Sequence, residues 1–197
     1  MLQVQASPTL RLVDGPTTAA IDLAAVKLHL RVTSAAEDDL INALITSATI
    51  EAEHLMGRAI MPQSWQLTLD AFEPSVPLRR PTVTAIESIT YLASADGVST
   101  VLDPGAYQLV AASDLSASVV PAFGLAWPTT RAQPEAVRIV FTCGYADAAA
   151  VPEPIRTWLK MRIGALYENR AAWTLGKAIE QNPFVDNLLD RFRVWSA

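Results

Sequence analysis

The chain has 197 residues and a formal net charge of −5, and 51% of its residues are hydrophobic while 18% are charged. This composition excludes a chain that is disordered throughout, and the length suffices for one domain with a core, alone or with an appendage. The acidic balance argues against a protein that grips nucleic acid, because such proteins cluster Lys and Arg to displace counterions from phosphates. No apolar run approaches the roughly 20 residues that span a bilayer, so no membrane partner is expected.

The N-terminal region predicts an extended arm followed by a short helix. Residues 1–20 carry proline and glycine without a sustained period and are expected to form the arm. A helix is expected over residues 22–31, with Asp22 as a favoured N-cap. Its predicted apolar face consists of Leu23, Val26 and Leu30.

A second, longer helix is expected over residues 35–57. Ser34 and Glu37 have the spacing of a capping box, in which the two side chains satisfy free backbone N–H groups at a helix start. Gly57 is typical of the residue that ends a helix. The predicted apolar face consists of Leu40, Ile41, Leu44, Ile45, Ala48, Ala52, Leu55 and Met56.

From residue 60 to residue 145 the apolar pattern changes from a helical period to the alternation of β-strands. Strands are predicted around residues 65–69, 85–91, 107–110 and 137–141. Asp96-Gly97 predicts a hairpin turn, because both positions tolerate a positive φ. The stretch from Ser113 to Gln133 is less regular, and we expect it to loop outward as a platform for neighbouring proteins. Because these strands form one block between helices, the predicted class is α+β: a small helical bundle with an inserted antiparallel β block.

Helical periodicity returns over residues 153–172, where Trp158, Leu159 and Ile163 share a face that we expect to pack on the second helix. The main domain is thus expected to span residues 21–172. Residues 173–197 form a linker and a short terminal helix that begins at Asn182-Pro183. One side of this helix carries Phe184, Val185, Leu188, Leu189, Phe192 and Trp195, with Arg191 and Arg193 nearby.

Two alternatives exist for the terminal helix. It can lay its apolar side in a groove of a partner, with Arg191 and Arg193 meeting acidic residues at the rim. It can instead fold back on its own domain. We favour the partner-docking interpretation, because the weakly patterned stretch 174–181 separates this helix from the preceding one.

No catalytic, metal-binding or cofactor-binding residues are predicted. His29 and His54, the only histidines, lie in predicted helices without a second ligand at metal spacing. Cys143, the only cysteine, lies in a predicted strand and is expected to be a packed, inert thiol. The acidic run 37–39 is explained by helix capping. The sequence also lacks a G-x-S-x-G elbow, a phosphate-binding glycine loop and an H-E-x-x-H motif.

Several stretches, in this order and spacing, resemble the head–tail connector (adaptor) family of long-tailed phages, prophages and gene transfer agents. The resemblance covers residues 20–170. It departs from the family pattern at Ala25, where an acidic residue is common, and at Ala146, where Gly is more frequent. The stretches that carry it are Ile21–Val32, Asp38–Ile41, Gly57–Ile60, Gln63–Leu67, Leu69–Phe72, Arg80–Val83, Asp96-Gly97, Tyr107-Gln108, Val137–Ile139, Gly144-Tyr145, Val151–Ile155 and Tyr167–Arg170.

The resemblance implies a structural, non-enzymatic protein of the particle neck, assembled in the cytoplasm of a bacterial host. Such subunits form a ring with themselves, usually of twelve copies, which binds the portal protein and presents a surface to a tail-side neck or stopper protein. DNA passes through the channel of the ring without specific binding, which suits the net charge of −5 because like charges repel. The terminal helix is then expected to dock on the portal.

Three other functions are compatible with the sequence. The chain could be another ring component of the neck or tail, such as a stopper or tail terminator, although those are generally β-rich with few helices. It could be a generic binding module whose helices cap a β domain. A small enzyme of an unrecognised type is a third reading, which would require an arrangement of carboxylates that no motif indicates.

Overall fold

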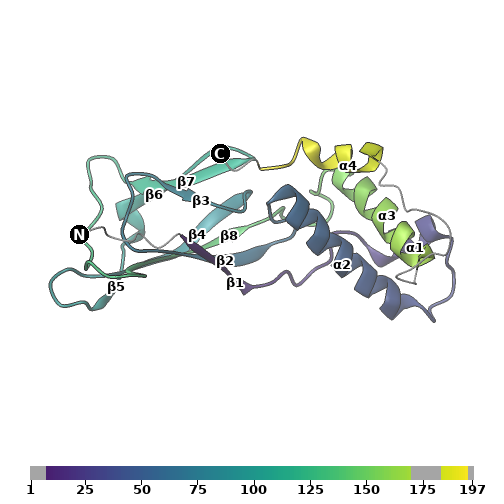
Figure 1. Ribbon diagram of the computed structural model, residues 1–197, viewed down its shortest axis with the longest axis horizontal. Coiled ribbons are helices and arrows are strands. Elements are labelled where there is room, and N and C mark those ends of the chain that lie inside the picture. The colour runs from purple at the N-terminus through teal and green to yellow at the C-terminus, as the bar shows by residue number, and fades with distance from the viewer. Residues whose placement is uncertain (1–7, 170–182, 195–197) are drawn as a thin grey trace. The chain divides into compact units, whose positions relative to one another are not determined.

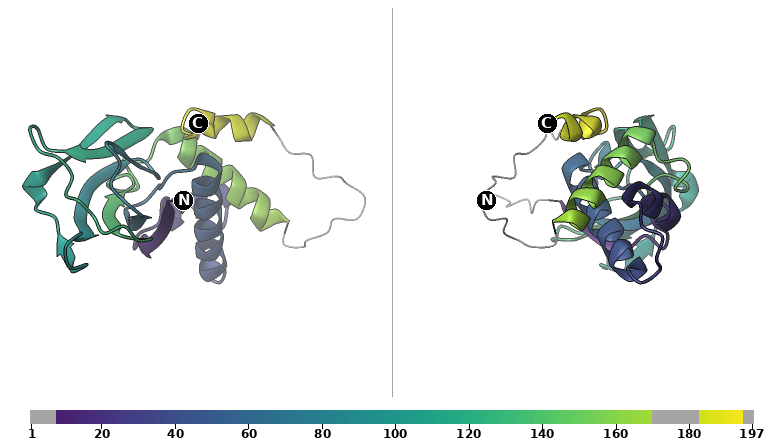
Figure 2. Two further views of the ribbon diagram at one scale, coloured as in Figure 1. Left: turned by 60° about the vertical axis from the view of Figure 1, so that its left-hand side comes forward. Right: turned by 90° about the vertical axis from the view of Figure 1, so that its right-hand side faces the viewer.

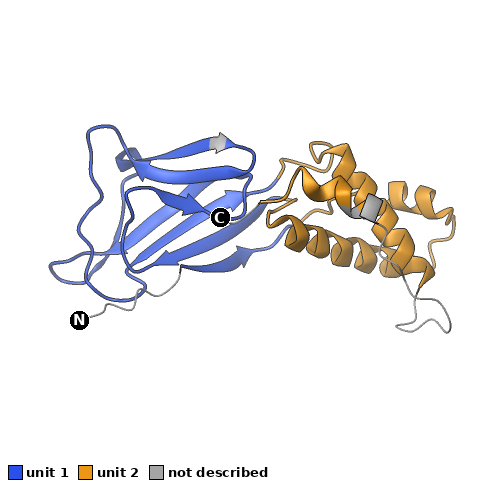
Figure 3. Ribbon diagram, turned by 45° about the horizontal axis from the view of Figure 1, so that its top comes forward, with its two compact units in different colours: residues 1–16, 62–144 blue, residues 17–61, 145–197 orange. Residues whose placement is uncertain are grey.

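The computed structural model describes residues 8–169 and 183–194, and the chain divides into two compact units. Unit 1 comprises Met1–Pro16 and Pro62–Gly144, and unit 2 comprises Thr17–Met61 and Tyr145–Ala197 (Figure 3). Unit 1 holds the strands and unit 2 the α-helices, so the predicted α+β class is confirmed.

Unit 1 contains two antiparallel sheets (Figure 1). The five-stranded sheet has the order β1-β2-β8-β4-β5, and the three-stranded sheet has the order β3-β7-β6. In chain order the strands are β1 (Thr9–Asp14), β2 (Gln63–Leu69), β3 (Val76–Leu78), β4 (Val83–Leu92), β5 (Ser99–Val101), β6 (Tyr107–Ser113), β7 (Ser116–Pro121) and β8 (Val137–Cys143), with the 3-10 turn η1 (Pro104–Ala106) before β6.

The core of unit 1 follows from strand alternation. In the central strand β8, every second residue is buried and Arg138 lies on the exposed side. The buried residues of β8 are Val137, Ile139, Phe141 and Cys143. In the smaller sheet, Val76 and Val119 are completely buried. Cys143 is a buried thiol, as expected, and its Sγ lies 3.8 Å from the carbonyl oxygen of Gln63.

The Asp96-Gly97 hairpin is confirmed. β4 and β5 pair antiparallel with Leu92 opposite Ser99, and Gly97 has a φ of 71°. The backbone N–H of Val98 donates to the Asp96 carboxylate at 3.0 Å, which closes the turn.

Part of the expected extended N-terminal arm is a strand, because β1 pairs with β2 from Thr9 opposite Thr68 to Asp14 opposite Ser64. One expectation for unit 1 is wrong. The stretch from Ser113 to Gln133 is not a continuous outward loop, because β7 is the central strand of the smaller sheet. Periodicity missed β7 because it is short and its buried residues are small or β-branched, so the apolar contrast along it is weak.

Unit 2 consists of the helices α1 (Leu23–Leu30), α2 (Asp38–Met56), α3 (Glu153–Glu168) and α4 (Pro183–Asp190). The predicted packing of the second helix on the helix near residue 160 is confirmed. The fully buried residues of this core include Val26, Ile41, Ile45, Ala48, Ala52, Met56, Ile155, Trp158, Leu159 and Ile163.

The start and the outer edges of α2 differ from the expectation. Its N-cap is Glu37 without a side-chain cap, and the Ser34 hydroxyl instead accepts the N–H of Ala36 at 3.1 Å. The predicted capping box is therefore wrong, because the chain makes a local turn over residues 34–36 before the helix begins. Leu40 and Leu55 flank the buried stripe and are exposed, so the buried face is narrower than predicted.

Polar contacts connect the helices of unit 2. Lys27 of α1 pairs with Asp38 of α2 at 2.5 Å, and Arg162 of α3 pairs with Glu51 of α2 at 2.7 Å. Among the described residues, no helix is both long and apolar enough to cross a membrane.

Candidate assembly surfaces

Helix α4 packs on the other helices of unit 2. Leu189 is completely buried in their core, and Val185, Leu188 and Phe192 are half-buried against it. After the helix, the backbone N–H of Val194 donates to the carbonyl of Met56 at 2.8 Å. This is the fold-back alternative of the sequence analysis, realised in this structure.

The cations near α4 differ in exposure. Arg191 is exposed, while Arg193 is half-buried and pairs with Asp190 at 3.2 Å. Phe184 belongs to α4, but its side chain lies outside the described part of the chain, as does Trp195. Contact of this set of residues with a portal protein stays a prediction.

The loop over residues 122–131 in unit 1 presents an exposed apolar tip. Phe123 is 102% exposed and Leu125 is 55% exposed. Below the tip, the Trp127 ring stacks on Phe72, with 4.5 Å between centroids and 6° between planes. Phe72 in turn contacts Tyr91 of β4, at 6.0 Å between centroids. An anchored loop that exposes apolar side chains is typical of a protein-contact surface.

Backbone hydrogen bonds fix both ends of this loop. At its start, the N–H of Ala122 donates to Ala106 at 2.9 Å. At its end, the N–H of Arg131 donates to Leu92 at 2.9 Å. The irregular part of the predicted platform is therefore held to the sheet at both ends.

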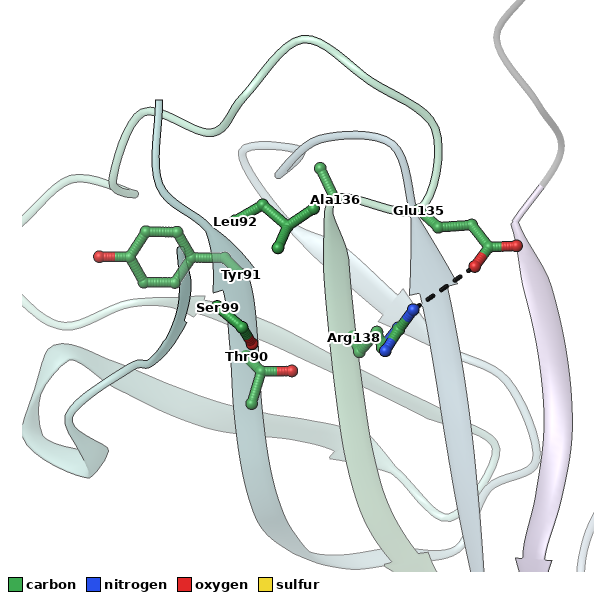
Figure 4. Close-up of a pocket in the computed structure, with 7 residues that line it drawn as sticks. All are labelled: Thr90, Tyr91, Leu92, Ser99, Glu135, Ala136 and Arg138. Atoms are coloured by element: carbon green, nitrogen blue, oxygen red, sulfur yellow. Dashed lines mark ion pairs between the residues drawn. The ribbon is translucent and has the colours of Figure 1, made fainter. Parts of the chain in front are cut away.

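A pocket of about 90 Å³ lies beside β4 and β8 (Figure 4). Across its mouth, Arg138 pairs with Glu135 at 3.6 Å. Ligand sites usually enclose roughly 300–1,000 Å³, so this pocket is too small for most substrates. Its lining offers hydroxyls and an ion pair but no nucleophile beside a general base. The lining residues are Thr90, Tyr91, Leu92, Ser99, Glu135, Ala136 and Arg138.

The described residues contain no group of three or more His, Cys, Asp or Glu side chains that could hold a metal ion. His29 and His54 are both exposed on their helices. Burial and then the Asp103 carboxylate raise the pKa of Tyr107, at the start of β6, above the usual 10.0. The raised pKa favours the neutral phenol.

Comparison with known proteins bears on the first helices and strands. Residues 20–92 match the model of the family described as phage gp6-like head-tail connector protein. The resemblance to the head–tail connector family is therefore confirmed. A comparison with curated proteins found no match.

Solved structures with a similar fold match nearly the whole chain. One is described as the neck of an empty GTA particle computed with C6 symmetry. It is 23% identical with a TM-score of 0.78, and the match covers 96% of this chain and 97% of that chain. A second comes from the virion of a native gene transfer agent (GTA) particle, with 24% identity, a TM-score of 0.76 and coverage of 95% and 96%. A third comes from the neck of a native GTA particle computed with C12 symmetry, with 22% identity, a TM-score of 0.72 and coverage of 96% and 97%. These likenesses establish a shared fold.

Proposed function

We propose that this chain is a non-enzymatic structural subunit of the neck of a phage or phage-like particle, where it joins the DNA-filled head to the tail. The observation that carries the proposal is the agreement of two independent likenesses. The family model matches residues 20–92, and the fold of nearly the whole chain is shared with chains from gene transfer agent particles, two of them from necks. The described surfaces suit this role, because they offer an apolar loop tip and exposed strand edges.

The proposed subunit assembles with copies of itself into a ring of twelve. The similar neck structures were computed with C6 and C12 symmetry, which supports a ring whose copy number is compatible with both. Such a ring surrounds the path of DNA from the head. The net charge of −5 suits a channel past which DNA slides, because like charges oppose binding.

Portal docking is proposed for the C-terminal segment that includes α4. Since Leu189 is buried in the core of unit 2, the docked state must either leave that residue in place or release it from the core. Docking with Leu189 left in place requires less rearrangement of unit 2. In that case Arg191 is the exposed cation that meets acidic portal residues, and the apolar residues hold α4 on its own subunit.

The apolar tip at Phe123 and Leu125 is proposed as the contact with a tail-side neck or stopper protein. Aromatic side chains dominate such interfaces when a partner covers them. Trp127 and its hydrogen-bonded neighbours already fix the backbone at the base of the loop. Binding of a partner at the tip therefore costs less conformational entropy.

The neck proposal is tested by removing the gene from a particle-producing strain and restoring it on a plasmid. Without the protein we expect DNA-filled heads and free tails that do not join, as counted by electron microscopy. With the restored protein carrying a small tag, a gold-labelled antibody should mark the head–tail junction. Tailed particles at the normal level in the deleted strain would contradict the proposal, and so would label confined to another part of the particle.

A further inference from the structure

The two sheets of unit 1 have four edges, and these differ in how well they are protected. A strand edge carries backbone N–H and C=O groups that can pair with another chain, so proteins shorten edges or place proline or charge there. β3 and β5 have 3 residues each, and β3 contains Pro77. β1 and β6 have 6 and 7 residues. Of the four edge strands, the longer ones are therefore β1 in one sheet and β6 in the other.

β1 exposes apolar side chains near its end. The successive residues Leu12 and Val13 are 43% and 41% exposed, and Val13 lies in the register shift between Leu12 and Asp14. Its charged residues are Arg11 and Asp14. The pairing with β2 is regular from Thr9 to Leu12 and shifts between Leu12 and Asp14. The regular stretch can therefore accept a further strand on its open side.

β6 has the corresponding properties in the smaller sheet. It contains no charged residue, and Val110 is 40% exposed. Its pairing with β7 is regular from Tyr107 to Ala111 and shifts between Ala111 and Ser113. Its regular stretch is thus comparable in length with that of β1.

We propose that β1 of one copy pairs with β6 of the next copy and that this strand pairing joins neighbouring subunits. This inference rests on the ring proposed above. Pairing of β1 with β1 would close a two-fold dimer, whereas pairing of two different edges repeats from copy to copy and closes a ring when the rotation between copies divides a full turn. β1 and the β6–β7 hairpin lie along opposite borders of unit 1 in Figure 1 and in the left view of Figure 2. Each copy can therefore use both edges at once, with a different neighbour on each side.

The strand pairing explains the exposure of both edges. Backbone hydrogen bonds supply the contact, and side chains such as Leu12 and Val110 become covered by the neighbour. The uncharged edge of β6 introduces no repulsion against either Arg11 or Asp14. The short edges β3 and β5 remain at the surface of the ring without a role in closing it.

The test is photocrosslinking in assembled particles, with a benzophenone amino acid at Val13 or, separately, at Ser113. Both positions lie beside the regular stretches and leave their hydrogen bonds unaltered. We expect a dimer of the chain in which Val13 is joined to a peptide containing Tyr107–Ser113, and Ser113 to a peptide containing Thr9–Asp14. The matched control is Val101 in β5, which is exposed and should give neither product.

The outcomes separate this inference from the neck proposal. Crosslinks to other segments of the chain or to another particle protein, with the chain present in the neck, would overturn the edge pairing alone. A chain that is absent from purified particles would overturn both. As a second measurement, Leu12→Lys and Val110→Lys should each abolish tailed particles while Val101→Lys does not, with the melting temperature of all three unchanged. Normal numbers of tailed particles from both edge variants would equally overturn the pairing.

Discussion

Replacing Leu189 by Ala tests whether α4 is part of the subunit core. The side chain is completely buried among the helices of unit 2. Val185, Leu188 and Phe192 are partly buried and pack against the same core. α4 has 8 residues and is too short to be stable alone in water, so its helical state depends on this packing.

The expected loss follows from the size of the truncation and the position of α4. Leu→Ala at a fully buried site destabilises by about 2–5 kcal/mol. Because α4 is a short helix of 8 residues, it can detach before the remaining core unfolds, which limits the loss to the free energy of its docking. We therefore expect about 2–3 kcal/mol, equivalent to a fall in melting temperature of roughly 4–12 °C for a chain of this size.

The assay is thermal unfolding followed by circular dichroism, together with denaturant unfolding to separate the transitions of the two units. The matched control is Arg191→Ala, because Arg191 is exposed in the same segment. This control should unfold like the wild type and yet bind isolated portal more weakly. Truncation after Gln181 should lower stability at least as much as Leu189→Ala.

An unchanged melting temperature for Leu189→Ala would refute the reasoning. It would mean that α4 does not contribute its buried leucine to the core in solution, and the segment would then be available to a partner as an independent helix. A fall in stability for Arg191→Ala equal to that of Leu189→Ala would also refute it, because an exposed side chain cannot lose the contacts of a buried one.

Three further predictions concern unit 1. Phe123→Ser should change the free energy of unfolding by less than about 0.5 kcal/mol, since the side chain is fully exposed, but should reduce the joining of tails counted by electron microscopy. Deletion of residues 114–126 should prevent folding of unit 1, because it removes the central strand β7 with its buried Val119, and a retained cooperative transition would contradict this. Because the pKa of Tyr107 is raised in the folded state, its neutral phenol contributes fully to the free energy of unfolding below pH 10, and this contribution is lost as the pH rises through the folded-state pKa. Tyr107→Phe should therefore reduce the loss of stability with rising pH in alkaline denaturation curves.

Local patterns predicted most of the elements correctly. The alternation around Val137–Phe141, the turn residues Asp96-Gly97 and the long apolar stripe of α2 each depend on neighbours within a few residues. Such signals act through backbone geometry, which the sequence near each position sets directly. The same signals failed where a competing local contact existed, as when Ser34 closed a turn in place of a capping box.

The sequence by itself determined the class of the fold, the confirmed family resemblance and the set of apolar residues available for burial. Only the tertiary structure decided which of those residues are buried and which strands stand at edges. Leu189 and Phe123 are both apolar residues, yet one is fully buried and the other fully exposed. The difference arises because burial and strand pairing depend on segments that are distant in the chain, and the free energy of such contacts is absent from any local window of sequence.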